Sequence, residues 1–334
     1  MNIYDISKQA GVSIATVSRV LNNNKNVSPK TRDKVLQVMK DAGYTPNAFA
    51  RGLGLNTMHT IGILCADSSD AYLSAAVYYL EQCLRQHNYD SLLCCTGYEL
   101  QTRRKYMNLL LSKRVDAIIL VGSNFVEIDS AKNDYILQCA KEVPIIILGG
   151  FIDAPNIYCV SCDDYNAIYH ATHTVLRWGY KRPVYLGRLL SYGGLRKQEG
   201  YTQAMIDAGF SSENIRHYQL NASIVPAKTN IAELYQKAPF DAVLTSDDEL
   251  AVSTLKFAFE QHLQLPKDLC IIGYNNSSLG LCCEPELSTI DNRVEDISVT
   301  AVEILMRVLD NRLPANHTLF PANLILRRST PQHS

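Results

Sequence analysis

The chain has 334 residues, of which 47% are hydrophobic and 19% are charged, and its formal net charge is −1. This composition excludes a disordered chain, and the length predicts two or three globular domains. No apolar run approaches the roughly 20 residues that a membrane-spanning helix needs, so we expect no membrane association. The chain begins without a basic and apolar leader, and most of its ten cysteines lie in apolar stretches. We therefore expect a cytoplasmic protein with buried, reduced thiols.

The charge is divided unevenly along the chain. Residues 1–58 contain eight Lys and Arg against three Asp and no Glu, which gives a net charge of +5 and leaves −6 for the remainder. This asymmetry indicates a polyanionic partner for the N-terminal segment alone.

Two short helices are predicted at the N-terminus. Apolar residues recur at helical spacing on both sides of Gly11, which stands where a sharp turn needs a positive φ. Ser13 can accept hydrogen bonds from the free N–H groups at the start of the second helix. The apolar positions are Ile6, Ala10, Val17, Val20 and Leu21. This pattern predicts a helix-turn-helix, whose second helix enters the DNA major groove.

A third helix is predicted to begin at Ser28-Pro29, with serine at the N-cap and proline at the first helical position. Its expected apolar stripe is Val35, Leu36 and Met39, and Ala42-Gly43 should end it. The segment that follows reads Tyr44-Thr45-Pro46-Asn47-Ala48-Phe49-Ala50-Arg51-Gly52-Leu53.

From Ile3 to Leu53 the sequence resembles, without gaps, the N-terminal headpiece of the LacI/GalR family of bacterial transcription regulators. Both the helix-turn-helix and the Tyr-x-Pro-Asn-x-x-Ala-Arg segment carry the resemblance. It implies a sequence-specific DNA-binding regulator, expected to be a repressor. A homodimer of such a protein would bind a pseudo-palindromic operator in double-stranded DNA.

The resemblance also implies which side chains contact DNA. Arg19 could reach phosphate or guanine, whereas Ile14 and Ala15 offer apolar contact. Leu53 matches the family's minor-groove wedge. The expected DNA-binding residues are Tyr4, Ser13, Ile14, Ala15, Thr16, Ser18, Arg19, Asn22, Asn47, Ala50 and Leu53. Gly52 and Gly54 flank the wedge, and each glycine costs a helix about 1 kcal/mol, so we expect a hinge that folds only on the operator.

From Thr60 onward, short apolar runs alternate with segments of helical period, which predicts parallel sheets covered by helices on both faces. The predicted strands are Ile61–Ala66, Ser91–Cys95, Ala117–Val121, Ile145–Leu148, Val184–Gly187, Ala242–Thr245 and Leu269–Gly273. The predicted helices include Ala71–His87, Gln101–Lys113, Tyr165–Trp178 and Glu249–His262. Ligands bind such sheets at the carboxyl ends of the strands.

These runs resemble the family's effector domain, which is similar to periplasmic sugar-binding proteins. The implied fold is an all-α helix-turn-helix headpiece followed by a periplasmic-binding-protein-like α/β domain of two doubly wound subdomains. We expect the headpiece at residues 1–45, a hinge helix and linker at 46–58, and the effector-binding and dimerisation domain at 59–334. Subdomain one would contain 59–159 and 291–319, and subdomain two 160–289 and 320–330.

The resemblance implies a small-molecule effector between the subdomains. The expected contact residues are Asp70, Tyr72, Thr96, Lys197, Asp247, Asp248 and Asn275. Three positions depart from the family's usual pattern, with Asp70 in place of Asn, Lys197 in place of Arg and Asn275 in place of Asp. Lysine cannot fork onto two oxygens as arginine does, so the effector cannot be transferred from a relative.

Carboxylates that accept hydrogen bonds from hydroxyls, beside a tyrosine ring, favour a neutral or weakly charged carbohydrate over a phosphate or nucleotide. Strand-end capping is the alternative role for Asp70, Asp248 and Asn275, and packing is the alternative for Tyr72.

Parts of the sequence are compatible with three other functions. A phosphocarrier protein or a sugar phosphate could be the effector, since family members that respond to a phosphocarrier also carry lysine near position 197. A pure sugar-binding protein would not need the headpiece. Asp67, Asp70, Asp163 and Asp247 could be imagined as a glycosidase pair, but none lies in a hydrolase motif, so we expect no enzyme. The sequence predicts no metal site and no cofactor.

Overall fold

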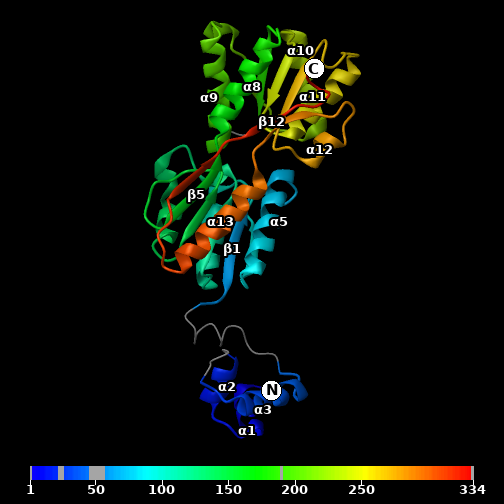
Figure 1. The fold of residues 1–334 in the computed structure, drawn as a ribbon. Coiled ribbons are helices and arrows are strands. Elements are labelled where there is room, and N and C mark those ends of the chain that lie inside the picture. Colours follow the sequence, from blue (N-terminus) through cyan, green and yellow to red (C-terminus); the bar gives the residue numbers. More distant parts are fainter. Residues whose placement is uncertain (1, 22–25, 45–56, 189–190, 332–334) are drawn as a thin grey trace. The chain divides into compact units, whose positions relative to one another are not determined.

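The computed structural model describes residues 2–21, 26–44, 57–188 and 191–331. The chain divides into two compact units, Met1–Thr60 with Arg114–Asp116, and Ile61–Lys113 with Ala117–Ser334. We call the helices of the first unit the headpiece and the second unit the core domain (Figure 1). Within the described ranges, no helix has the length and apolar character needed to cross a membrane.

The headpiece contains the predicted helix-turn-helix and third helix. Its helices are α1 (Ile3–Ala10), α2 (Ile14–Leu21) and α3 (Pro29–Asp41). Gly11 ends α1 with a φ of 61°, as the turn requires. Ser13 Oγ accepts a hydrogen bond from the Thr16 N–H at 3.1 Å, and Ser28 Oγ accepts one from the Thr31 N–H at 3.2 Å. The predicted caps are therefore confirmed.

The three headpiece helices bury one small apolar core. Its buried members are Ile6, Ala10, Val17, Val20, Val35 and Met39. Leu36 was predicted to join the α3 stripe, but 48% of its surface is exposed. Each helical residue turns by about 100°, so Leu36 points away from the side shared by Val35 and Met39. That part of the prediction is wrong.

Residues 57–188 and 191–331 contain two six-stranded sheets, whose strand orders are β11-β5-β4-β3-β1-β2 and β12-β10-β9-β8-β6-β7. The first sheet is built from β1 (Thr60–Cys65), β2 (Asp90–Cys95), β3 (Ala117–Val121), β4 (Ile145–Leu148), β5 (Ile157–Cys162) and β11 (His317–Phe320). The second is built from β6 (Pro183–Gly187), β7 (His217–Gln219), β8 (Ala242–Thr245), β9 (Cys270–Tyr274), β10 (Ser288–Asp291) and β12 (Asn323–Ile325). The interior pairs are parallel, and β12 runs antiparallel to β10.

Helices cover both faces of each sheet, as the doubly wound fold class predicts (Figure 1). With the first sheet lie α5 (Ala71–Gln86), α6 (Leu100–Ser112), α7 (Asp134–Cys139) and α13 (Val294–Leu309). With the second lie α8 (Asp164–Arg177), α9 (Tyr192–Asp207), α10 (Ile224–Lys237), α11 (Asp248–Glu260) and α12 (Ser278–Leu281). Helices α5 and α13 share one core with β1 and β3, and α10 and α11 share another with β8 and β9. We call the two layered units subdomain one and subdomain two.

In the described core domain the chain crosses between the subdomains from β5 to α8, from β10 to α13 and from β11 to β12. Arg293, in the second crossing, has a φ of 58°, and its guanidinium lies 4.9 Å from the ring centroid of Phe320 in the third. The second and third crossings therefore contact each other directly.

The cysteines are largely buried, which agrees with the interpretation from sequence. Seven of the ten are buried, while Cys95 and Cys282 are exposed. Cys159 and Cys162 have Cys-x-x-Cys spacing, but both lie on strand β5, where residues three apart point to opposite faces. Cys159 Sγ contacts the Ile152 backbone, whereas Cys162 Sγ contacts the Tyr274 hydroxyl. Burial raises the pKa of Cys159 to about 11 and that of Cys162 to about 12, so neither is a reactive thiolate.

Candidate functional site

Helix α2 presents a solvent-facing surface beside the turn that precedes it. Ala15 and Arg19 are exposed, Ile14 is 40% exposed, and Thr16 and Ser18 are half-buried, while Val17 and Val20 face the headpiece core. Tyr4 on α1 is 66% exposed, and the Ser13 and Thr16 hydroxyls share a hydrogen bond of 2.9 Å.

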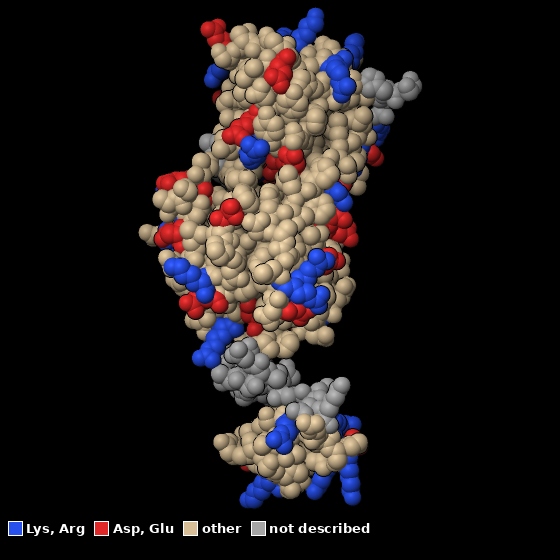
Figure 2. Space-filling view, turned by 60° about the vertical axis from the view of Figure 1, so that its left-hand side comes forward, with Lys and Arg blue, Asp and Glu red and all other residues tan. Residues whose placement is uncertain are grey.

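Basic side chains project from the headpiece surface (Figure 2). The exposed ones among the described residues are Lys8, Arg19, Lys30, Lys34 and Lys40. Helix α2 thus offers a short apolar and hydroxyl-bearing surface in a headpiece whose three helices all carry exposed cations, which suits a DNA groove flanked by phosphates. The predicted contacts Asn22, Asn47, Ala50 and Leu53 lie outside the described residues.

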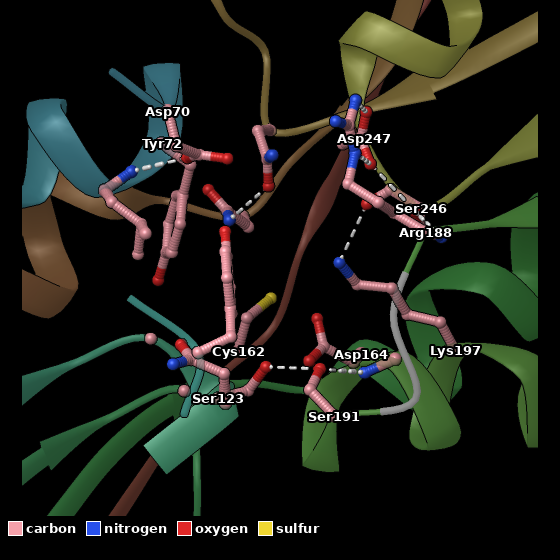
Figure 3. Close-up of a pocket in the computed structure, with 18 residues that line it drawn as sticks. Asp70, Tyr72, Ser123, Cys162, Asp164, Arg188, Ser191, Lys197, Ser246 and Asp247 are labelled. Atoms are coloured by element: carbon pink, nitrogen blue, oxygen red, sulfur yellow. Dashed lines mark hydrogen bonds and ion pairs between the residues drawn. The ribbon is translucent and has the colours of Figure 1, made fainter. Parts of the chain in front are cut away.

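The core domain has a cavity where loops at the carboxyl ends of both sheets meet (Figure 3). We call it the polar cavity. Its lining includes Asp70, Tyr72, Tyr98, Ser123, Asn124, Gly149, Cys162, Asp164, Arg188, Ser191, Lys197, Ser246, Asp247, Asn275 and Asn292. Of the seven predicted effector residues, it contains Asp70, Tyr72, Lys197, Asp247 and Asn275. Both subdomains contribute to it, so a ligand here would contact both.

Asp70 both caps a helix and lines the polar cavity. Its Oδ1 accepts a hydrogen bond from the Leu73 N–H at 2.9 Å, which leaves the second carboxylate oxygen for another partner. Burial raises the pKa of Asp70, and the charge of Asp247 adds to that effect. The Tyr72 ring points into the cavity, and burial raises the pKa of its hydroxyl (Figure 3).

Asp247 on the opposite side is held by an arginine that the sequence analysis missed. Arg188 Nε and Nη2 donate to its two carboxylate oxygens at 3.2 Å each, and Nη2 also donates to Glu249 at 2.7 Å. Asp247 caps α11 as well, accepting from the Leu250 N–H at 3.0 Å. Two carboxylates therefore neutralise Arg188.

Lys197 is directed into the polar cavity (Figure 3). Its Nζ donates to the Ser246 carbonyl at 3.0 Å and lies 3.5 Å from the ring centroid of Tyr274. The Tyr274 hydroxyl donates to Asp164. Burial raises the pKa of Asp164, and the positive charge of Lys197 acts in the opposite direction. The lysine therefore has a carbonyl, a ring face and a carboxylate around it.

Amide groups complete the polar cavity. Asn292 Nδ2 donates to Asn275 Oδ1 at 2.9 Å. Among the described residues, Asn292 Oδ1 and Asn124 Nδ2 are buried without a hydrogen-bond partner in the chain. A buried polar atom without a partner is costly, so these two atoms mark positions where a ligand could supply a donor and an acceptor.

Two predicted effector residues do not line the polar cavity. The Thr96 hydroxyl is buried and donates to the Gly97 carbonyl at 2.8 Å. Asp248 is buried among Ser277 and Thr289, whose hydroxyls donate to it at 2.7 and 2.6 Å. Asp247 is the N-cap of α11 and Asp248 is the first residue of that helix, so the two side chains leave the backbone in different directions and only Asp247 lines the cavity. Asp248 therefore forms hydrogen bonds within the protein, which is the alternative to effector binding that the sequence left open.

The cavity residues that were not predicted include Ser123, Asn124, Asp164, Arg188, Ser191 and Asn292. Arg188 could have been found, because it directly follows the predicted strand that ends at Gly187. Ser123 and Ser191 belong to different subdomains, and their hydroxyls share a hydrogen bond of 2.9 Å across the junction. Sequence alone carries no signal for that pairing.

Comparison with known families matches both parts of the chain. Residues 2–47 match the family described as bacterial regulatory proteins, lacI family. Residues 58–314 match the family described as periplasmic binding proteins and sugar binding domain of LacI family. The two matches together cover the headpiece and most of the core domain.

Among curated proteins, the chain is 51% identical to an HTH-type transcriptional regulator of Lachnoclostridium phytofermentans, over 99% of each chain. It is 31% identical to catabolite control protein A of Staphylococcus epidermidis, again over 99% of each. Among solved structures, it is similar to a lac repressor dimer bound to operator and the anti-inducer ONPF, with a TM-score of 0.88, 21% identity and 99% coverage of each chain. A CelR–cellobiose complex matches with a TM-score of 0.70 and 20% identity, covering 98% of this chain and 99% of that one. At these identities, the two structures establish the fold.

Proposed function

Because this chain belongs to the LacI family of bacterial regulatory proteins, and is a DNA-binding transcription regulator and not an enzyme, we propose that it is a repressor controlled by a neutral carbohydrate. It would act as a homodimer on a pseudo-palindromic operator, with α2 of each headpiece in a major groove. The related lac repressor was solved as a dimer on its operator, which supports this arrangement. Leu53, at the hinge, would be the minor-groove wedge.

The charges of the polar cavity carry the proposal of a neutral effector. Asp70, Asp164 and Asp247 line it together with Arg188 and Lys197. Arg188 is already neutralised by Asp247 and Glu249. Lys197 lies over the ring of Tyr274, whose hydroxyl donates to Asp164. An anionic ligand would meet surplus carboxylates, whereas hydroxyls can donate to them.

The partnerless amide atoms and the aromatic rings add to this argument. Asn124 Nδ2 can donate to a sugar oxygen, and Asn292 Oδ1 can accept from a sugar hydroxyl. The rings of Tyr72 and Tyr98 can cover an apolar sugar face. The CelR–cellobiose complex is a sugar-bound protein of the same fold, which is consistent with this ligand class.

Regulation would follow from a shift between subdomain arrangements. The effector contacts loops of both subdomains, so it stabilises the arrangement in which those loops are close. The three chain crossings would absorb the change, and the subdomain arrangement would determine whether the two hinge segments can fold on DNA.

The effector proposal is tested by a thermal-shift screen of neutral sugars, sugar phosphates and a phosphocarrier protein. A ligand at 100 times its Kd adds about 2.7 kcal/mol to the free energy of unfolding, so a neutral sugar that binds should raise Tm measurably. Lys197→Met should remove that shift, whereas Lys256→Met, at an exposed position of α11, should retain it. If only sugar phosphates or the phosphocarrier stabilise the wild type, the neutral-carbohydrate proposal is wrong.

The operator proposal has a separate test. Genome-wide footprinting of the purified protein should recover sites that consist of two related half-sites. Transcript levels of the adjacent genes should be lower when the protein is present than when it is absent. Sites without two-fold symmetry would contradict the dimer, and activation of those genes would contradict the repressor role.

A further inference from the structure

A second cavity adjoins the polar cavity at the subdomain junction. It encloses about 700 Å³, within the range of about 300–1,000 Å³ that ligand pockets occupy. Gly149, Cys162 and Asp164 line both cavities, so the two share a wall. We call the second space the aromatic cavity because of the rings described next.

Subdomain one supplies an aromatic wall. The Phe151 ring lies against the His317 ring, with centroids 4.5 Å apart and planes inclined by 30°. A hydrogen bond of 3.2 Å joins His317 Nε2 to Ser161 Oγ, which fixes the imidazole. Burial lowers the pKa of His317, so the ring is neutral at pH 7. Tyr192 and Leu195 on α9 line the cavity from subdomain two. The space thus has apolar and aromatic surfaces on both sides.

The charged groups of the aromatic cavity are mainly acidic. Carboxylates come from Glu127, Asp153, Asp163 and Glu199, in addition to Asp164 of the shared wall. Glu127 is already paired with Arg103 at 2.7 Å. Asp153 accepts from Asn316 Nδ2 at 2.9 Å, and Asp163 accepts from Asn166 Nδ2 at 2.6 Å, so their orientations are fixed. Arg196 pairs with Glu199 at 2.8 Å. An excess of oriented acceptors beside aromatic rings matches a neutral ring that carries hydroxyls, and it disfavours an anion.

Side chains from both subdomains meet at the partition between the cavities. The hydrogen bond between the Ser123 and Ser191 hydroxyls stands beside the shared wall (Figure 3). Gly193 follows on α9, and a Cβ there would lie 2.7 Å from Asp164 Oδ2 and 3.1 Å from Ser123 Oγ. A neutral hydroxyl pair contributes about 1 kcal/mol, so a sugar hydroxyl could replace it at little cost.

We propose that the two cavities form one elongated site for an oligosaccharide, with the first sugar ring in the polar cavity and the next ring against the Phe151–His317 wall. This inference rests on the proposed carbohydrate effector and narrows it to chains of two or more sugars. The polar cavity supplies most of the directional hydrogen bonds, and the aromatic cavity supplies stacking and acidic acceptors for the second ring.

The test is a calorimetric titration of the full-length protein with sugars of increasing length. Three series are suitable: glucose, cellobiose and cellotriose; glucose, maltose and maltotriose; and xylose, xylobiose and xylotriose. In at least one series the affinity should rise about tenfold or more from the monosaccharide to the disaccharide, which corresponds to about 1.4 kcal/mol. Phe151→Ala should remove this gain and leave the monosaccharide affinity unchanged.

Two further variants complete the design. Tyr192→Leu alters the opposite wall with a smaller change in volume, and it should reduce the same gain if Phe151→Ala fails to fold. Phe259→Ala is the matched control, because Phe259 is 78% exposed on α11 and lines neither cavity, and it should retain the gain.

The outcomes separate this inference from the proposed function. Equal affinities for mono- and disaccharides in every series would overturn the elongated site and leave a monosaccharide effector standing. Equal losses of mono- and disaccharide affinity in the wall variants would also overturn it. If no neutral sugar binds while a sugar phosphate or a phosphocarrier protein does, both the inference and the carbohydrate effector are wrong.

Discussion

Arg103 on α6 should hold the polar cavity together from behind, although it does not line it. Only 5% of its surface is exposed. Its Nη1 donates to the Asn124 carbonyl at 2.6 Å and to Glu127 at 2.7 Å, and its Nη2 donates to the Tyr98 carbonyl at 2.5 Å. Tyr98 and Asn124 both line the polar cavity, so one buried guanidinium fixes two of its loops.

Arg103→Ala would leave the half-buried Glu127 carboxylate and two carbonyls without this donor. Removing one member of a buried charge pair costs about 3–5 kcal/mol, and Glu127 retains 26% side-chain exposure, so we expect a loss near the lower limit, about 3 kcal/mol. A domain of this size loses roughly 2–4 °C in Tm per kcal/mol, which predicts a decrease of about 6–12 °C. Glu127→Gln in the Arg103→Ala background should restore part of it, because no unpaired charge remains.

Thermal melts followed by circular dichroism at one protein concentration would measure this effect. Arg104→Ala is the matched control, since the neighbouring Arg104 pairs with Asp134 at the exposed surface, where a salt bridge contributes little. Equal Tm values for the Arg103 and Arg104 variants would refute the argument. Strict additivity of the Arg103→Ala and Glu127→Gln effects would refute the coupling between those two residues.

Three further predictions concern other parts of the chain. Arg19→Ala should weaken operator binding, and wild-type affinity should fall steeply with salt as phosphate contacts release counterions; a gel-shift affinity that ignores salt would contradict this. Gly200→Ala should destabilise the core domain by about 1–3 kcal/mol, because a Cβ there would lie 2.2 Å from the Tyr165 carbonyl of α8; an unchanged melting curve would rule this out. Asp70→Asn should raise Tm at pH 7. Burial raises the pKa of Asp70 above its usual 3.8. The contribution of this carboxyl group to stability is therefore present at low pH and is lost as the pH rises through the folded-state pKa. The difference between variant and wild type should therefore shrink as the pH falls towards 4, and a constant difference would count against it.

Local sequence patterns determined the headpiece helices and seven of the twelve strands that the structure describes in the core domain. The Ser13 and Ser28 caps, the Gly11 turn and the helical periods act within a few residues, so they can be recognised without the fold. Parallel strands such as β3 and β9 are buried on both faces, so each is a continuous apolar run that can be recognised in the sequence. Five strands were not predicted, namely β5, β7, β10, β11 and β12. Strands β7 and β12 are three residues long, so they have no periodicity to detect. Strands β5, β10 and β11 carry polar residues such as Ser161, Thr289 and His317, so they do not read as continuous apolar runs.

The tertiary structure decided which residues line the polar cavity. The strand-end rule identified Asp70 and Asp247, but it could not say that Asp248 turns into the core. That direction depends on where α11 begins and on the partners Ser277 and Thr289. Ser123 and Ser191 are 68 residues apart, and Asp164 and Tyr274 are 110 apart. Such pairs meet because two separate sheets direct their carboxyl ends to one junction, and that arrangement leaves no trace in local sequence.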